Sequence, residues 1–251
     1  ALTFDIAVTD STFTATGLTP ATGYFYFLRS ACDTNVNANS WTSGLFHTAC
    51  PATVELPYGE SFEGIPSGSG TEPECWTYAE NVTSSSSHYI STTSPHGGTQ
   101  CMYFYPYGYQ YLISPAMPAG TNPAELEITF WGKINSSGSS RIEVGLMTDP
   151  ADLTTFRPMS NHGSNSGTWT EYNVYTDTTT LTAEQTVYVA FRVYCSNGWS
   201  NYIDDISIAN AGCRRPASLS VTGVSPYTAS LEWPAVTGAS GYRLVYSTTV
   251  D

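Results

Sequence analysis

The sequence predicts an all-β protein, and three observations support this fold class. Gly (21 residues) and Pro (15 residues), with abundant Ser and Thr, separate short aromatic and β-branched runs, as turns separate strands. No long stretch repeats its apolar residues with the period of a helix. Several runs instead alternate apolar and polar residues, which places one face of a strand against a core. We therefore expect packed antiparallel sheets, with helix confined to short turns.

The two ends of the chain predict two parts of one small sandwich. The stretch GLTPATGY at residues 17–24 is similar to a tyrosine corner, which precedes a late strand of immunoglobulin-like sandwiches. Near the other end, Trp233 follows an alternating run and Tyr242 lies on the next expected strand. These residues resemble a fibronectin type III domain that is cut in the middle and transposed. Neither half can bury its apolar face alone, because a sandwich core needs both sheets.

We therefore expect residues 213–251 to be the N-terminal half of a fibronectin type III domain, and residues 1–50 to be its C-terminal half in the next copy. Three origins of such ends remain open: an arbitrary start in a tandem repeat, a nick in an exposed loop, or subunits that complete each other by strand addition. All three place copies end to end. The chain is thus interpreted as one period of a repeating array.

Residues 51–212 predict a second domain. Alternation in three runs places these residues on the core face: Leu126, Ile128, Phe130, Ile142, Val144, Leu146, Val187, Val189 and Phe191. Seven motifs, in order, resemble the jelly-roll domains of the MAM and cleaved-adhesin type found in large secreted proteins of Bacteroidota: PYGESFE (57–63), CW (75–76), LISP (112–115), ELEITFW (125–131), VGLMTDP (144–150), VAFR (189–192) and YIDDISI (202–208). The resemblance implies a jelly-roll β-sandwich.

The chain has six cysteines and no CxxC pair, which favours disulfides over zinc and an oxidising, extracellular compartment. Counting does not fix their connectivity. The fibronectin resemblance implies that Cys32 lies near Cys213 of the adjacent copy, and we expect these two to bond. The other four are then expected to pair most simply as Cys50 with Cys75 and Cys101 with Cys195.

A jelly roll places its first and last strands side by side, which brings Glu60 and Glu63 near Asp204 and Asp205. Clustered carboxylates repel unless a cation joins them, and calcium prefers oxygen ligands. A structural calcium ion is therefore expected here, as the resemblance also implies. Strand alternation sends Asp204 and Asp205 to opposite faces, so at most one of them should bind. The other interpretation is a hydrogen-bonded carboxylate beside a backbone turn.

The segment MYFYPYGYQY at residues 102–111 places aromatic residues on both faces of a strand and in the following turn. Half of them must point away from the core. Such rings pack against another domain or subunit, where Tyr is enriched, or stack on sugar rings. The predicted surface consists of Tyr103, Tyr105, Tyr107, Tyr109, Tyr111 and Trp199, with Trp169 as a further candidate.

Composition argues against several function classes. The formal charge is −13, and phosphate binding depends on a basic surface, so nucleic acid is not an expected partner. No apolar run is long enough to span a bilayer. The four histidines are scattered, with no HExxH or GxSxG motif, so we expect no enzymatic activity.

These observations predict a non-enzymatic structural or adhesive protein outside the cell, on a bacterial surface. It would be one period of a repeating fibre or giant tandem-repeat adhesin, with further copies of itself as partners. The alternative is a carbohydrate-binding segment of a larger secreted hydrolase or haemagglutinin, with glycans or host and cell-surface proteins as partners.

Overall fold

The structure is a computed structural model, which describes residue 7 and residues 9–29, 41–81, 87–105, 107–135, 139–196, 199–212, 218–236 and 239–246. In these ranges the chain forms strands and two short 3₁₀ helices, η1 (Pro123–Glu125) and η2 (Leu153–Thr155), so the all-β prediction is confirmed. The described residues contain no helix with the length and apolar character to cross a membrane.

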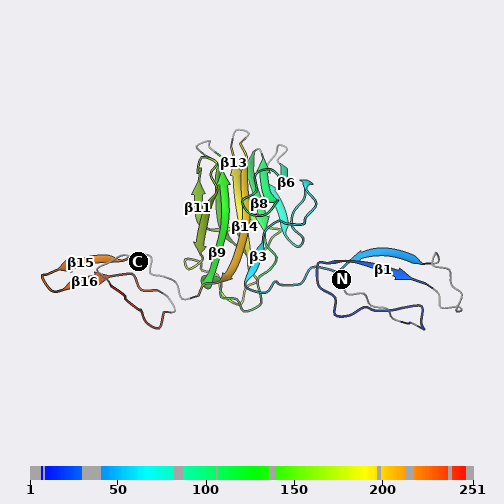
Figure 1. The fold of residues 1–251 in the computed structure, drawn as a ribbon, viewed down its shortest axis with the longest axis horizontal. Coiled ribbons are helices and arrows are strands. Elements are labelled where there is room, and N and C mark those ends of the chain that lie inside the picture. The colour runs from blue at the N-terminus through cyan, green and yellow to red at the C-terminus, as the bar shows by residue number, and fades with distance from the viewer. Residues whose placement is uncertain are drawn as a thin grey trace.

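The centre of the molecule is a sandwich of two antiparallel sheets (Figure 1). The five-stranded sheet has the order β11-β10-β13-β8-β5, and the seven-stranded sheet has the order β12-β9-β14-β7-β6-β4, with β3 beside β14. The first sheet contains β5 (Thr77–Asn81), β8 (Gly108–Ile113), β10 (Arg141–Met147), β11 (Arg157–Gly163) and β13 (Tyr188–Cys195). The second contains β3 (Tyr58–Glu60), β4 (Gly68–Ser69), β6 (Ser87–Ser91), β7 (Cys101–Tyr105), β9 (Leu126–Ile134), β12 (Thr170–Tyr175) and β14 (Asn201–Asn210).

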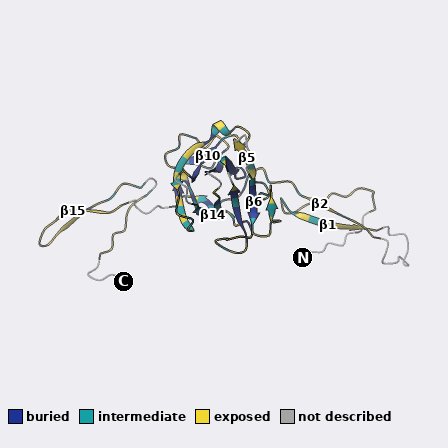
Figure 2. Ribbon diagram, turned by 90° about the horizontal axis from the view of Figure 1, so that it is seen from above, coloured by how far each residue is buried: buried dark blue, intermediate teal, exposed yellow. Residues whose placement is uncertain are grey.

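The core lies between the two sheets, and strand alternation supplies it (Figure 2). Along β9 every second residue is buried, from Leu126 to Ile134. All nine core residues expected from alternation are buried in this one cluster. Phe130 and Phe191 meet edge to face across the sheets, with ring centroids 5.2 Å apart. Burying a side chain of this size stabilises the fold by about 1.5–3 kcal/mol.

The first and last strands of the sandwich lie side by side, as predicted for a jelly roll. β3 pairs with β14, so that Glu60 lies opposite Ile206. On its other edge β14 pairs with β9, and this register shifts between Asp204 and Ser207. Asp205 has a φ of 46° within the shifted stretch. The result is a β-bulge, which redirects the side chains of the acidic pair.

Two hairpins lie outside the sandwich, one on each side (Figure 1). β1 (Gly23–Leu28) pairs with β2 (Thr42–His47), and β15 (Ser220–Val224) pairs with β16 (Ala229–Glu232). Each pair forms a separate two-stranded sheet. Most of their residues are exposed, in contrast to the sandwich (Figure 2).

Both hairpin regions contain contacts of the aromatic residues named in the sequence analysis, although Tyr242 lies outside any strand. The hydroxyl of Tyr24 accepts a hydrogen bond from the backbone N–H of Thr19 at 2.8 Å, which is the bond of a tyrosine corner. Trp233 meets Tyr242 edge to face, with ring centroids 5.4 Å apart. The division of one fibronectin domain between the two chain ends remains a prediction.

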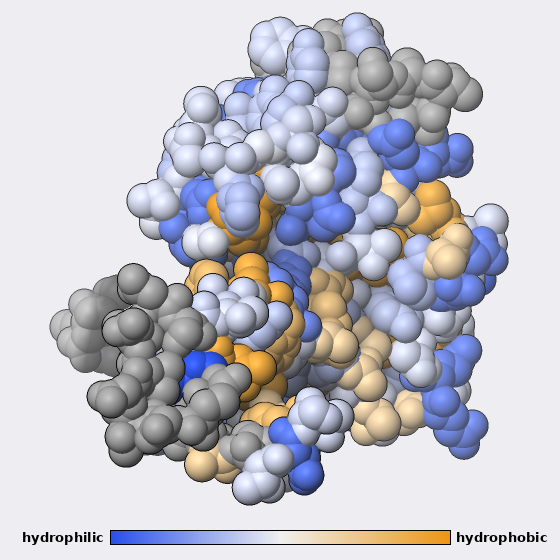
Figure 3. Space-filling view, turned by 90° about the vertical axis from the view of Figure 1, so that its right-hand side faces the viewer, coloured by the Kyte–Doolittle hydropathy of each residue, from blue (hydrophilic) through white to orange (hydrophobic). Residues whose placement is uncertain are grey.

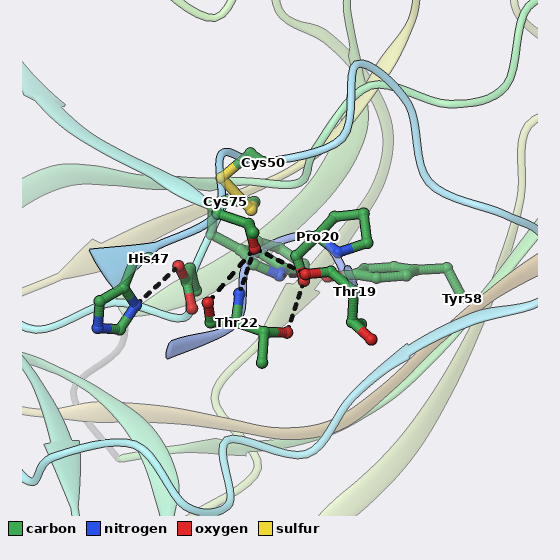
Figure 4. Close-up of a disulfide and its surroundings, with 10 residues drawn as sticks. Thr19, Pro20, Thr22, His47, Cys50, Tyr58 and Cys75 are labelled. Carbon is green, nitrogen blue, oxygen red and sulfur yellow. Dashed lines mark hydrogen bonds and ion pairs between the residues drawn. A yellow bond between two sulfur atoms is a disulfide. The ribbon is translucent and has the colours of Figure 1, made fainter. Parts of the chain in front are cut away.

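A disulfide joins Cys50 to Cys75, with a Cα–Cα distance of 5.6 Å, as predicted (Figure 4). Cys101 and Cys195 are free and buried, so their predicted bond is wrong. The sulfur of Cys195 lies 3.5 Å from the carbonyl oxygen of Phe104. Cys101 begins the same strand as Phe104, about 10 Å away along β7, which is too far for a disulfide. The expected bond between Cys32 and Cys213 lies outside the described residues.

Candidate ligand-binding face

The predicted aromatic surface is divided, because its two strands belong to different sheets. In β7, Met102 and Phe104 enter the core, whereas Tyr103, between them, and Tyr105, after Phe104, lie on the outer side of the seven-stranded sheet. Two more of the predicted residues are exposed outside the strands, Tyr107 and Trp199.

Tyr109 and Tyr111 lie in β8, on the outer side of the five-stranded sheet. Tyr111 is only 4% exposed and packs edge to face on Phe156. The guanidinium of Arg192 lies 4.9 Å from the ring centre of Tyr109 and binds the carboxylate of Glu143 through two hydrogen bonds of 2.8 and 3.0 Å. These rings are covered by their own neighbours. The six predicted aromatic residues therefore do not share one surface.

Tyr103 instead belongs to a row of rings across the seven-stranded sheet. Strand pairing places it opposite both Tyr89 of β6 and Tyr202 of β14. The ring centroids lie 5.4 and 5.0 Å away, both edge to face. Tyr105 stacks on Tyr103 at 6.2 Å. Three neighbouring strands thus present tyrosine rings on one surface.

The row continues beyond Tyr202. Its ring lies 6.2 Å from that of Trp169, which lies 5.7 Å from the imidazole of His96. The imidazole stacks on Trp131 at 3.7 Å. The indole N–H of Trp169 donates to the carbonyl oxygen of Ser94 at 3.3 Å. We call this connected set the aromatic face: Tyr89, His96, Tyr103, Tyr105, Trp131, Trp169 and Tyr202.

A groove with a volume of about 340 Å³ lies on the aromatic face. Tyrosine, serine and threonine residues line it, together with one isoleucine: Ser67, Tyr89, Ile90, Ser91, Thr92, Thr93, Tyr103 and Tyr202. Near it, the ammonium of Lys133 donates to the hydroxyl of Ser94 at 2.7 Å and lies 5.2 Å from the ring centre of Tyr202. The groove therefore offers both apolar ring surfaces and hydrogen-bonding groups.

Three of the four predicted calcium ligands contact one turn, residues 96–100, which precedes β7. Asp204 accepts hydrogen bonds from the backbone N–H groups of His96 and Gly97, at 2.8 and 3.2 Å. A carboxylate oxygen of Asp205 lies 2.7 Å from Nδ1 of His96. The β-bulge lets both carboxylates reach the same turn, which regular alternation along the strand does not predict.

Glu63 holds the other part of this turn. It accepts the backbone N–H groups of Thr99 and Gln100, at 2.7 and 2.8 Å, and the hydroxyl of Thr99 at 2.7 Å. The bonds from Thr99 lower the pKa of Glu63, whereas burial raises the pKa of Asp204 to about 6. Glu60 makes none of the hydrogen bonds to this turn described above: it accepts the N–H of Phe62 at 2.6 Å, and burial raises its pKa.

These contacts correspond to the second interpretation, in which hydrogen-bonded carboxylates support a turn. Within the described ranges, no group of three or more His, Cys, Asp or Glu side chains is arranged to hold a metal ion. A Cβ at Gly97 would lie 2.6 Å from Asp205 Oδ2, so the carboxylate approaches the turn closely. Oxygen donors are what calcium prefers, and calcium binding here remains a prediction.

The four histidines lie at separate places. His47 is 3.9 Å from Glu74, and His88 is 3.0 Å from Glu72, whereas His96 and His162 pack against aromatic rings. Burial raises the pKa of the two free thiols, Cys101 and Cys195, to about 12, so both stay protonated at neutral pH. The expectation of no enzymatic activity stays a prediction.

No protein-family model matches the chain, and no curated protein matches its sequence. Among solved structures, the K1 cleaved adhesin domain of Lys-gingipain from Porphyromonas gingivalis is similar over 63% of this chain and 100% of that domain, with 20% identity and a TM-score of 0.49. The K3 cleaved adhesin domain of the same protein is similar over 61% of this chain and 97% of its own, with 18% identity and a TM-score of 0.46.

A xylan-binding domain from Paenibacillus barcinonensis is similar over 64% of this chain and 98% of its own, with 10% identity and a TM-score of 0.44. At such values a function does not carry over from one chain to another. The residues of this chain therefore carry the functional argument.

Proposed function

We propose that the protein is a non-enzymatic extracellular module that joins further copies end to end, as one period of a bacterial surface fibre or tandem-repeat adhesin. The exposure of both end hairpins carries this proposal. Phe25 of β1 is 76% exposed and Val224 of β15 is 79% exposed. An isolated two-stranded hairpin is at best marginally stable in water, and large apolar patches mark interaction sites.

Each hairpin region offers a set of apolar side chains to a partner. In Figure 3 hydrophobic residues gather in the lower part of the view, where the N-terminal hairpin faces the reader. That end exposes Phe13, Phe25, Phe27, Leu28, Trp41, Leu45 and Phe46. The C-terminal end exposes Leu219, Val221, Val224, Leu244, Val245 and Tyr246. The occupant we propose for each set is the opposite end of a second copy.

Unpaired backbone supports the same partner. Residues 241–246 have the sequence GYRLVY, which favours a strand, yet they belong to no strand in the single chain. Among the residues that the structure describes, no further strand pairs with either edge of the β1–β2 hairpin. Strand addition between copies would satisfy these backbone groups and cover the apolar side chains together. The disulfide fits an extracellular location.

Two variants test this joint. Phe25→Asp places a charge on the N-terminal set, and Val221→Asp places one on the C-terminal set. Each variant alone is expected to stay monomeric, because its intact end finds only a damaged partner. A mixture of the two is expected to stop at dimers. Analytical ultracentrifugation measures these masses, and Tyr107→Asp, in the sandwich, is the matched control. Variants that associate like the wild type would contradict the proposed end-to-end joint.

The groove on the aromatic face favours a second candidate function, the binding of glycans. Sugar rings present apolar C–H faces and a rim of hydroxyls, and the groove supplies Tyr rings beside Ser and Thr hydroxyls. An adhesive module could use this face toward glycans of a host or cell surface while its ends join other copies.

A glycan array tests this candidate. Tyr103→Ala removes the central ring, whose neighbours lie 5.4 and 5.0 Å away, and is expected to weaken binding at least tenfold. Tyr107→Ala removes an exposed ring outside the aromatic face and should leave binding unchanged. A thermal melt verifies that both variants fold. If no glycan binds the wild type, or if both variants bind equally well, the aromatic face is not a glycan site.

A further inference from the structure

The N-terminal hairpin enters the sandwich through a short and weakly paired segment. After β2 the chain reaches β3, whose three residues pair with residues 206–208 of β14. The next strand, β4, adds only two residues, paired with β6. Beyond these five paired residues, only a few hydrogen bonds and buried side chains, chiefly that of Phe62, hold the segment against a pull along the chain. A pull on the N-terminal hairpin would therefore act first on β3 and β4.

The disulfide bypasses this segment (Figure 4). Cys50 lies just after β2, and Cys75 lies just before β5. At the base of the hairpin, the hydroxyl of Thr48 donates to the carbonyl oxygen of Thr19 at 2.7 Å and accepts the N–H of Thr22 at 3.0 Å. Both ends of the hairpin thus converge beside Cys50.

We propose that the Cys50–Cys75 bond is a mechanical clamp, which passes tension from the N-terminal hairpin directly to β5 and keeps residues 51–74 folded under load. The proposal rests on the proposed function in one respect, namely that the module bears load through its ends. Tension that reaches Cys50 crosses the bond to Cys75, so the enclosed segment, residues 51–74, cannot be extended between these two cysteines.

Beyond the clamp, the chain is anchored more firmly. Trp76 follows Cys75 and is buried, and its ring lies 6.4 Å from that of Phe191 in the core. β5 then pairs with β8 along its whole length of five residues. Tension that crosses the disulfide is therefore resisted by the buried indole of Trp76 and by the backbone hydrogen bonds between β5 and β8.

The enclosed segment supports the candidate ligand-binding face. Glu63 holds the turn at residues 96–100, and this turn carries His96 of the aromatic face. Ser67 lines the groove itself. Loss of β3 from the edge of β14 would withdraw Glu63 from the turn. The clamp thus keeps the face intact while the ends of the module are pulled.

Single-molecule force spectroscopy on the full chain, with handles at its two ends, tests the clamp. After reduction, an early low-force event is expected to release the enclosed segment before the sandwich unfolds. The disulfide spans 25 positions and holds its Cα atoms 5.6 Å apart, so this event lengthens the chain by about 80 Å. The oxidised chain should lack the early event. The double variant Cys50→Ser, Cys75→Ser should behave like the reduced chain, with or without reductant.

A reduced chain that unfolds in one event, at the force of the oxidised chain, would overturn the proposal, because β3 and β4 would then not yield first. Reduced wild type provides this comparison without any substitution. The measurement pulls one molecule, so its outcome does not depend on assembly between copies. A failure of the end-to-end proposal would leave this result intact.

Discussion

Asp204 is a buried carboxylate whose burial and hydrogen bonds have opposite effects on its pKa. Burial raises its pKa to about 6, and N–H donors from His96, Gly97 and Asp205 act in the opposite direction. The folded pKa lies above the ordinary aspartate value of 3.8, so folding favours the protonated form. The stability this gives is present below pH 3.8 and is lost as the pH rises through 6. The three N–H bonds offset part of the cost of burying the charge.

His162 gives the opposite pH dependence. Its ring lies 4.2 Å from that of Tyr172, Nε2 lies 2.9 Å from the hydroxyl oxygen of Ser160, and burial lowers its pKa below 6.5. The folded state then binds this proton less readily than the unfolded state, so the free energy of unfolding should fall as the pH drops below 6.5.

We expect His162→Gln to lose this part of the pH dependence. Urea unfolding of wild type and variant at neutral and mildly acidic pH gives the difference, in which the other titrating groups cancel. Equal pH dependence in the two proteins would contradict the assignment to His162.

Alternation places most single side chains correctly, and it fails where the backbone departs from a regular strand. Tyr103, between Met102 and Phe104, has to face outward by period two, and Trp131 follows from Phe130 in the same way. Asp204 and Asp205 break this rule, because the bulge adds residues to β14 that have no partner on β9. Nothing in the sequence YIDDISI marks that bulge.

The sequence predicts which strands pair where the jelly-roll resemblance gives the order of the strands. It does not predict which of the two sheets each strand joins. The contact of β3 with β14 follows from jelly-roll closure. The segment 102–111 contains two strands, β7 and β8, that enter different sheets, so its tyrosines separate. The same division separates Cys101 of β7 from Cys195 of β13. Short aromatic runs do not encode which sheet a strand joins.

The Cys50–Cys75 disulfide also contributes to the free energy of unfolding. Replacing both Cys50 and Cys75 by Ser is expected to lower the free energy of unfolding by about 3 kcal/mol, because the bond constrains a 25-position loop in the unfolded chain. Urea denaturation of the oxidised wild type and the double variant measures this loss. Reductant should destabilise the wild type and leave the variant unchanged, and an equal effect on both would contradict the role of this bond.

Calcium is expected to act at the turn that the acidic side chains support. A cation bound only by the folded state raises the melting temperature, so added calcium should raise it and EDTA should reverse the effect. Glu63→Gln should lose the response, whereas Glu60→Gln should keep it, because Glu60 bonds only locally to Phe62. A melting temperature of the wild type that neither calcium nor EDTA changes in calorimetry would contradict calcium binding at this turn.

At the scale of the whole molecule, the sandwich and its two hairpins differ in how well they cover their apolar residues. The sandwich buries one continuous cluster between its sheets, whereas the hairpins on either side expose Phe, Leu, Val and Tyr side chains (Figure 2). The end-to-end proposal accounts for this difference, because the exposed side chains of each hairpin would be covered by the opposite end of a second copy. Head-to-tail contacts of this kind form open chains unless the rotation closes a ring.

The mass of the 251-residue chain in solution, measured by light scattering over a concentration series, tests this account most directly. The account predicts a mass that rises with concentration in steps of the 27.1 kDa unit, under reducing as well as oxidising conditions. A mass that stays at 27.1 kDa at every concentration would contradict it.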